Sequence, residues 1–108
     1  MPTVYKTLGQ VEGAASNTNL YTVPTATEAI VSTIIVCNRA ATAKTYRIMV
    51  RPNAETLATK HYIAFDVSIG ANDTTALTLG LALDAADRLD VYSSDSNVSF
   101  SAFGTEIS

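Results

Sequence analysis

The residue types that most often carry out catalysis are scarce in this sequence. Cys37 is the single cysteine and His61 the single histidine among 108 residues. A cysteine becomes a nucleophile when its surroundings favour the thiolate, but the sequence around Cys37 holds no second cysteine and no known catalytic signature. We therefore interpret Cys37 as a small buried apolar residue. We interpret His61 as a strand-end residue that faces solvent or an interface.

A group of aspartates could bind calcium, because carboxylates are preferred ligands of that ion. They are Asp73, Asp84, Asp87, Asp90 and Asp95. Asp84 and Asp87 could supply two ligands from one turn, but their spacing matches no EF-hand loop. Aspartate is also common in turns, where its side chain accepts hydrogen bonds from nearby backbone N–H groups. We expect this turn-capping role, and we expect no bound metal or cofactor.

Basic side chains could recognise a charged partner. Arg39, Lys44, Arg47 and Arg51 lie close together in the sequence and could contact phosphate groups. The net charge of −3 and the scattered basic residues argue against a nucleic-acid surface. A solvated face or a salt-bridging interface is the favoured interpretation.

The tyrosines could stack on sugar rings, as they do in carbohydrate-binding modules. If the protein binds glycans in this way, Tyr21, Tyr62 and Tyr92 are the candidates. Tryptophan, which such platforms favour, is absent, and Tyr46 falls on an apolar strand face. Buried or interface positions are therefore the favoured interpretation of the tyrosines.

The elements that must position these side chains are β-strands. Residues 28–38 are rich in β-branched side chains, which fit a pleated strand better than a helix. On a regular strand, Ile30 and Ile34 share one face, and Val31 and Ile35 share the other. Both faces are largely apolar, so we expect a central strand that is covered on both faces.

Shorter segments with alternating polarity surround this strand in the sequence. They cover residues 3–11, 20–23, 44–51, 61–69, 75–83, 88–93 and 98–103. Gly80 should mark a bulge or bend, and residues 54–61 should form a loop or a single turn. Within residues 61–69, the side chains expected to face inward are Ile63, Phe65, Val67 and Ile69.

These segments predict one all-β domain. We expect an antiparallel β-sandwich of about eight strands, jelly-roll-like, with an immunoglobulin-like sandwich as the alternative. Residues 1–19 are expected to be an N-terminal arm, or a first strand and loop, of the same domain. Residues 20–108 form the sandwich.

The composition indicates contact with other proteins. Hydrophobic residues make up 47% of the chain and charged residues only 16%, which suggests that part of the surface meets another subunit. No apolar run approaches the ~20 residues that span a bilayer, and the sequence does not open on a signal-peptide core. We expect neither a nucleic acid nor a membrane as a partner.

Several short motifs resemble small virion proteins of tailed bacteriophages. These motifs are Leu20-Tyr21-Thr22-Val23-Pro24, the strand that ends in Val36-Cys37-Asn38-Arg39, Tyr46-Arg47-Ile48, residues 60–66, Asn72-Asp73-Thr74 and residues 98–104. The resemblance covers about residues 20–107, although Thr25-Ala26-Thr27 stands where Ala-Gly usually follows the proline. It implies a structural role and transfers no active site.

The resemblance and the lack of a catalytic cluster lead to one expectation about function. We expect a structural virion protein and not an enzyme, most simply a capsid decoration or cement protein that bridges and stabilises neighbouring capsid subunits. A tail or neck component, or a glycan-binding adhesin, is the alternative. The protein would be assembled into the virion in the host cytoplasm, as a dimer or trimer of copies in contact with other virion proteins. The candidate contact residues are Val4, Tyr5, Leu8, Arg47, Met49, Arg51 and Phe103.

Overall fold

The alternating segments form eight strands in this structure, a computed structural model that describes residues 3–108. The strands are β1 (Thr3–Glu12), β2 (Thr18–Thr22), β3 (Glu28–Asn38), β4 (Lys44–Arg51), β5 (Tyr62–Ile69), β6 (Thr74–Leu83), β7 (Arg88–Ser93) and β8 (Val98–Ile107). Two single turns of 3-10 helix, η1 (Pro52–Ala54) and η2 (Thr59–His61), lie between β4 and β5, where a loop or single turn was predicted. The expected N-terminal arm begins with residues 1–2, which lie outside the described residues, and β1 is the expected first strand.

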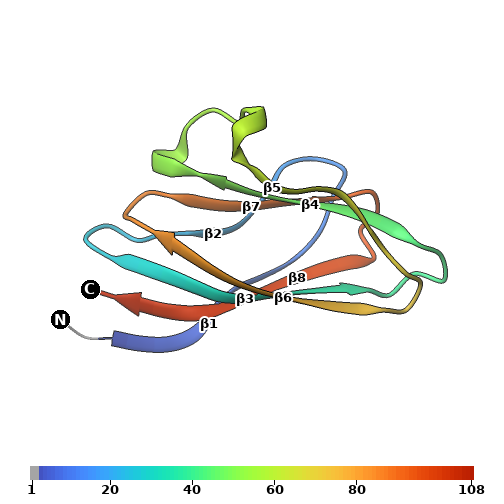
Figure 1. Cartoon of the computed structure of the whole chain (residues 1–108), viewed down its shortest axis with the longest axis horizontal. Coiled ribbons are helices and arrows are strands. Elements are labelled where there is room, and N and C mark those ends of the chain that lie inside the picture. Colours follow the sequence, from blue (N-terminus) through green and yellow to red (C-terminus); the bar gives the residue numbers. More distant parts are fainter. Residues whose placement is uncertain (1–2) are drawn as a thin grey trace.

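The strands pair as two antiparallel sheets, with the orders β1-β8-β3-β6 and β2-β7-β4-β5 (Figure 1). β4 pairs with β5, β3 with β6, β2 with β7 and β1 with β8. The chain is therefore one long hairpin, bent between β4 and β5, whose paired arms are rolled into two layers. This is jelly-roll topology. The predicted fold class is confirmed, and the immunoglobulin-like order does not fit.

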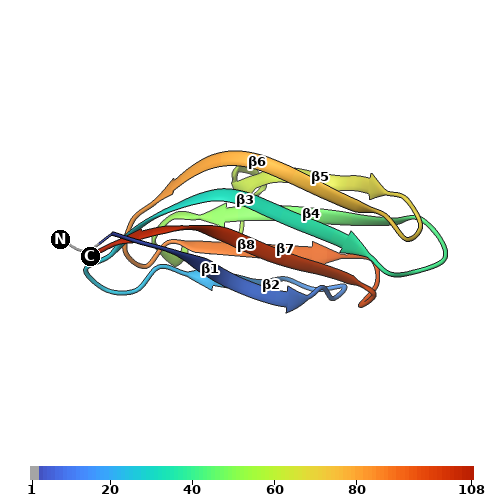
Figure 2. The same ribbon diagram turned by 90° about the horizontal axis from the view of Figure 1, so that it is seen from below.

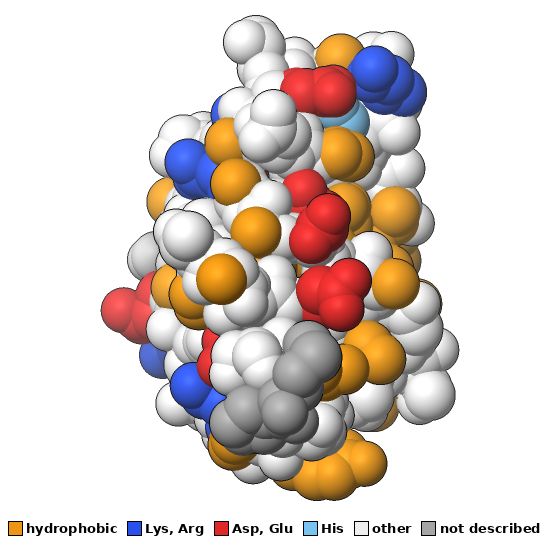
Figure 3. Space-filling view, turned by 90° about the vertical axis from the view of Figure 1, so that its left-hand side faces the viewer, with side chains coloured by type: hydrophobic (Ala, Val, Ile, Leu, Met, Phe, Trp, Pro, Cys, Tyr) orange, Lys and Arg blue, Asp and Glu red, His pale blue; other side chains and the backbone are white. Residues whose placement is uncertain are grey.

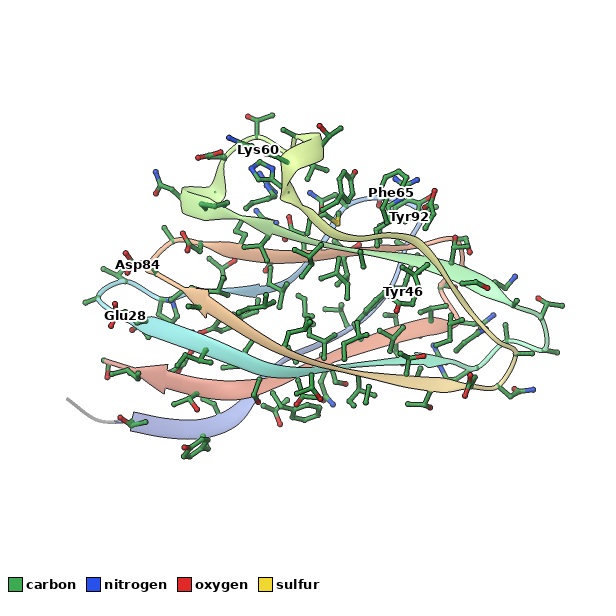
Figure 4. The ribbon with its side chains drawn as sticks, viewed as in Figure 1. Glu28, Tyr46, Lys60, Phe65, Asp84 and Tyr92 are labelled. Atoms are coloured by element: carbon green, nitrogen blue, oxygen red, sulfur yellow. The ribbon has the colours of Figure 1, made fainter. Side chains whose placement is uncertain are left out.

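The core lies between the two sheets and is built from alternate residues of the strands. Tyr46 is 2% exposed, and its ring packs edge-to-face on Phe100 with centroids 6.2 Å apart. Figure 4 shows Tyr46 pointing between the layers. The buried position predicted for this tyrosine is confirmed.

β3 departs from regular alternation. Its register with β6 and β8 shifts between Val31 and Thr33, and one extra residue in a strand moves the following side chains to the other face. Val31 and Ile34 therefore both face the core, whereas Ile30 is 44% exposed. The prediction that Ile30 and Ile34 share a face was wrong because of this shift, and the prediction of a strand covered on both faces was wrong because only one face of β3 packs against the other sheet. On β6 the same shift spans Gly80, so the predicted bulge there is confirmed.

β5 was predicted to place four apolar side chains inward, and this was wrong for Phe65. Asp66 has a left-handed backbone with φ of 50°, and the register with β4 shifts at this point. The bulge turns Phe65 onto the outer face, where it is 55% exposed. Ile63 and Val67 lie toward the core but stay 46% and 39% exposed, while Ile69 is buried.

The two long sides of the sandwich differ, and the first is closed. Gly9 of β1 approaches β2 so closely that a Cβ atom there would lie 2.1 Å from the carbonyl oxygen of Leu20. The Tyr21 hydroxyl of β2 donates a hydrogen bond to Glu106 of β8 at 2.5 Å. Lys6 of β1 pairs with the same carboxylate at 3.1 Å. Side chains thus tie the two sheets together along the β1/β2 side.

The opposite side is open. An apolar groove of about 240 Å³ lies between β5 and β6, with β4 at its floor. Its lining consists of Tyr46, Ile48, Ile63, Ala64, Val67, Leu77 and Leu79. We call this groove, together with the free edge of β6, the β5/β6 side.

Candidate interaction surface

The outer face of the β2-β7-β4-β5 sheet carries a cluster centred on Arg47 of β4. The guanidinium carbon lies 4.3 Å from the ring centroid of Phe65, 4.2 Å from that of Tyr92 and 6.0 Å from that of Tyr62. These are cation–π distances. Arg47 also donates hydrogen bonds to Asp66, from Nε at 2.6 Å and from Nη2 at 3.3 Å. We call these five residues the Arg47 cluster.

The cluster forms because three neighbouring strands each place a side chain on the same face. Alternation along β4 turns Arg47 outward, and Tyr92 is its register partner on β7. The left-handed Asp66 brings Phe65 to the same face from β5. Figure 4 shows Phe65 and Tyr92 side by side on this face. The hydrogen bond to Asp66 raises the pKa of Arg47 above its ordinary value, so the guanidinium stays charged.

A second polar centre lies beside the cluster and is built on Asp90 of β7. Asp90 is fully buried and accepts hydrogen bonds from Asn19 at 3.0 Å, Arg51 at 2.7 Å and Arg88 at 3.2 Å. Burial alone would raise the pKa of Asp90, but hydrogen bonds from Asn19 and Arg51 and the charge of Arg88 outweigh it, and the pKa is lowered. The centre joins β2, β7 and β4, which indicates a structural role.

His61 is buried, so the prediction that it faces solvent or an interface was wrong. Its Nδ1 accepts a hydrogen bond from the backbone N–H of Ala58 at 2.9 Å, and its Nε2 lies 3.3 Å from Glu55. The hydrogen bond with His61 and the charge of Lys60 lower the pKa of Glu55. The imidazole therefore organises the loop between β4 and β5, because both of its nitrogens have partners within that loop.

The residues predicted for recognition are divided among several places. Arg47, Tyr62 and Tyr92 come together in the Arg47 cluster, and Arg51 lies next to it at Asp90. Met49 is on the same face of β4 but is only 1% exposed, so it offers no contact surface in this structure. Tyr21 is buried at the closed side and is not part of a tyrosine platform.

The remaining predicted contact residues belong to the other sheet. Val4 and Tyr5 of β1 are 49% and 84% exposed. Leu8 packs against the core, and Phe103 is half-buried on β8. The seven residues predicted as one contact set are thus divided between the two sheets, and two of them offer little contact surface in this structure, because Leu8 packs against the core and Met49 is buried.

The acidic side chains mostly cap turns, as predicted. Asp73, Asp84 and Asp95 accept hydrogen bonds from backbone N–H groups one or two residues further along the chain, and Asp87 accepts one from Asp84. Several acidic side chains form a line at the end of the molecule that carries both termini (Figure 3). Within residues 3–108, no three His, Cys, Asp or Glu side chains are arranged to hold a metal ion.

Cys37 was predicted to be buried, but it is only half-buried, on β3 of the β1-β8-β3-β6 sheet. His61 lies in the loop that joins β4 to β5 of the other sheet. The two candidate catalytic residues are therefore not brought together.

Sequence reasoning missed the outward position of Phe65 and the role of Asp66, and it wrongly gave Asp90 a turn-capping role, since Asp90 is buried within β7. The signal for the first two was a charged residue inside an otherwise apolar alternating segment, which is where a bulge can re-aim a side chain. The signal for Asp90 was its place two residues after Arg88, on the same strand face.

No protein-family model matches this sequence, and no curated protein matches it. None of the helices among residues 3–108 has the length and apolar character needed to cross a membrane.

Proposed function

We propose that this protein is a structural component of a tailed-phage virion, and that it acts as a decoration or cement protein on the capsid. The observation that carries the proposal is the Arg47 cluster, in which one half-buried arginine contacts three aromatic rings on the outer face of a sheet, with Phe65 exposed to solvent. Arginine and tyrosine are enriched at the energetic centres of protein interfaces. The phage-like motifs of the sequence support the virion setting.

The mechanism in this proposal is physical. The Arg47 cluster is held in place by Asp66 and by three strands, so little conformational entropy is lost when it meets a partner. Each contact can be modest, because many copies on one lattice add their retention through avidity. A protein attached across neighbouring capsid subunits opposes their separation, which stabilises the particle.

The test compares complete particles with particles that lack this protein. We expect the incomplete particles to release DNA at a lower temperature, and purified protein added back to restore their heat resistance. An Arg47→Ala variant should rebind at least about tenfold more weakly, which corresponds to about 1.4 kcal/mol. The matched control is Arg39→Ala, since Arg39 is an exposed arginine that pairs with Glu12 away from the cluster.

Circular dichroism of both variants shows whether they remain folded. A Phe65→Ala variant tests the same cluster through a residue of β5 and should also rebind more weakly. Equal heat resistance with and without the protein would refute the cement role.

The alternative is a tail or neck component, including a glycan-binding adhesin. Tyr62 and Tyr92 lie near one another, which favours a sugar platform, but Arg47 is positioned over both rings. Locating the protein on the particle by electron microscopy separates the capsid from the tail. A glycan array with wild type and Tyr92→Ala then tests for an adhesin.

A further inference from the structure

We infer that two copies of this chain pair through the free edges of their β6 strands. This inference rests on the proposed function only for the expectation that copies of the protein meet. It extends that function by naming the surface through which they pair. It is carried by a contrast among the four sheet edges.

A free strand edge exposes unpaired backbone N–H and C=O groups and invites another strand, so natural proteins guard such edges with charge, brevity or bulges. β1 carries Lys6 and Glu12, both in ion pairs. β2 has only five residues. β5 has two register irregularities, and one of them holds Asp66 in its left-handed conformation. Each of these three edges is guarded.

β6 is different. It has ten residues, Thr74–Leu83, and none of them is charged. It lies at the margin of its sheet, opposite β1 (Figure 2), and among the described strands it pairs only with β3. Its single irregularity spans Gly80, which leaves Thr74–Thr78 regular. Its outward side chains Ala76 and Thr78 are small and exposed, so a second backbone can approach.

The occupant that fits this edge is a second β6. A free edge is completed by another strand, and within the described chain the other three edges are guarded. Each copy carries a net charge of −3, so two copies repel one another in general. The ten residues of β6 include no charged side chain, so pairing along this strand places no like charges opposite one another within it. Antiparallel pairing about a two-fold axis satisfies both edges with the same surface.

This pairing also covers the groove next to β6. The two-fold axis that joins the β6 strands brings the groove of one copy toward that of the other. Leu77 and Leu79, together with the exposed Ile63 and Val67, then face apolar atoms instead of water. The dimer thus removes apolar surface from water in addition to pairing the backbones.

Asp73 and Asp84 flank β6 and come near each other at the two ends of the antiparallel pair. Because exposed like charges are screened by salt, we expect added salt to strengthen the dimer.

Sedimentation velocity of the purified full-length chain, from about 1 µM to about 500 µM, tests the inference without any particle. We expect the 11.4 kDa chain to form a dimer in this range. Thr78→Lys places two lysines close to the two-fold axis and should weaken the dimer at least tenfold. The matched control is Thr7→Lys, which adds the same charge at an exposed position on the opposite edge of the same sheet. Equal loss with both variants overturns the inference, and so does a wild-type monomer at the highest concentration.

Hydrogen exchange of the wild type gives a readout that needs no variant. Amides of β6 should gain protection as the concentration rises, whereas amides of β1 should not. Protection that is unchanged in β6 overturns the inference. A chain that stays monomeric in solution but still stabilises particles would leave the proposed function intact.

Discussion

The two long sides of this sandwich differ in how they shield the core between the sheets. Along the β1/β2 side, a glycine lets two backbones approach, and the Tyr21 hydroxyl and the Lys6 ammonium group converge on Glu106. Along the β5/β6 side, no side-chain hydrogen bond or ion pair joins β5 to β6 among the described residues, and an apolar groove remains. Only at one end of this side does the side chain of Asn38 of β3 donate hydrogen bonds to the carbonyl groups of Ile69 and Gly70. The β1/β2 side is closed by its own side chains, whereas the β5/β6 side leaves apolar side chains exposed at the groove.

The difference teaches where this chain can accept a partner. A side whose polar groups are already paired gains little from a new contact, because each new hydrogen bond must replace an old one. A side that exposes apolar side chains and a free strand edge gains both burial and backbone pairing.

The largest expected difference in stability is between two single variants, each of which adds one methyl group to one side of the sandwich. Gly9→Ala places a Cβ atom 2.1 Å from the backbone oxygen of Leu20, so β1 or β2 must move. We expect a loss of about 3 kcal/mol in the free energy of unfolding. Gly80→Ala meets no atom within 4 Å and should change stability by no more than about 0.5 kcal/mol. Urea denaturation at low protein concentration measures both. Similar losses for the two variants would contradict the contrast between the sides.

A smaller effect is expected from removing one hydroxyl on each side. Tyr21→Phe deletes the donor to the Glu106 carboxylate and should cost about 2 kcal/mol, as for a hydrogen bond to a charged group. Tyr46 lines the groove, and its hydroxyl forms no hydrogen bond with another described residue, so Tyr46→Phe should cost well under about 1 kcal/mol. Thermal unfolding followed by circular dichroism compares the two. If Tyr46→Phe is the more harmful change, the closed side does not depend on its hydroxyl.

The smallest effect is a pH dependence of the closed side. The hydrogen bond from Tyr21 lowers the pKa of Glu106 below its ordinary 4.5, with a further contribution from Lys6, although burial opposes the shift. A lowered folded-state pKa gives stabilisation that is complete above pH 4.5 and is lost as the pH falls below it. Glu106→Gln should therefore lose less stability than wild type on acidification.

The lowered pKa of Asp90 leaves part of the acid dependence in that variant. At the alkaline limit the sign reverses. Burial, the hydrogen bond to Glu106 and the charge of Glu106 raise the pKa of Tyr21 above its ordinary 10.0, so the stabilisation from this contact is complete below pH 10.0 and is lost progressively as the pH rises above it. Urea titrations across both limits measure these changes, and identical acid profiles for wild type and Glu106→Gln would refute the role of this carboxylate.

Much of the fold could be predicted, because hydrophobic alternation is a local property. The regular pattern of β4 correctly placed Tyr46 and Ile48 inward and Arg47 outward. The pattern failed at Ser32 and Asp66, where a bulge reverses the alternation. A bulge arises where one strand has an extra residue between two positions that pair with its neighbour. The sequence of one segment alone does not show this, so Ile30 and Phe65 were assigned to the wrong faces.

The candidate site was predicted only in its parts. Arg47, Tyr62 and Tyr92 were all named, but for different purposes, since sequence separation hides that β4, β5 and β7 are neighbours. Tyr21 was grouped with them by residue type. Its contact with Glu106 could not be predicted, because it depends on β8 lying across from β2 in the folded protein. Asp90 is the same residue type as the turn aspartates, and only its buried surroundings in the folded protein distinguish it from them.

The sequence by itself determined that this chain forms strands, that those strands bury one apolar face, and that most of the aspartates between strands cap turns. These outcomes depend on interactions between residues a few positions apart. Only the tertiary structure decided which strands lie at the edges, which side of the sandwich closes, and which aromatic rings surround Arg47. Those outcomes depend on contacts between segments far apart in the chain, whose geometry is set by strand order and by the bulges.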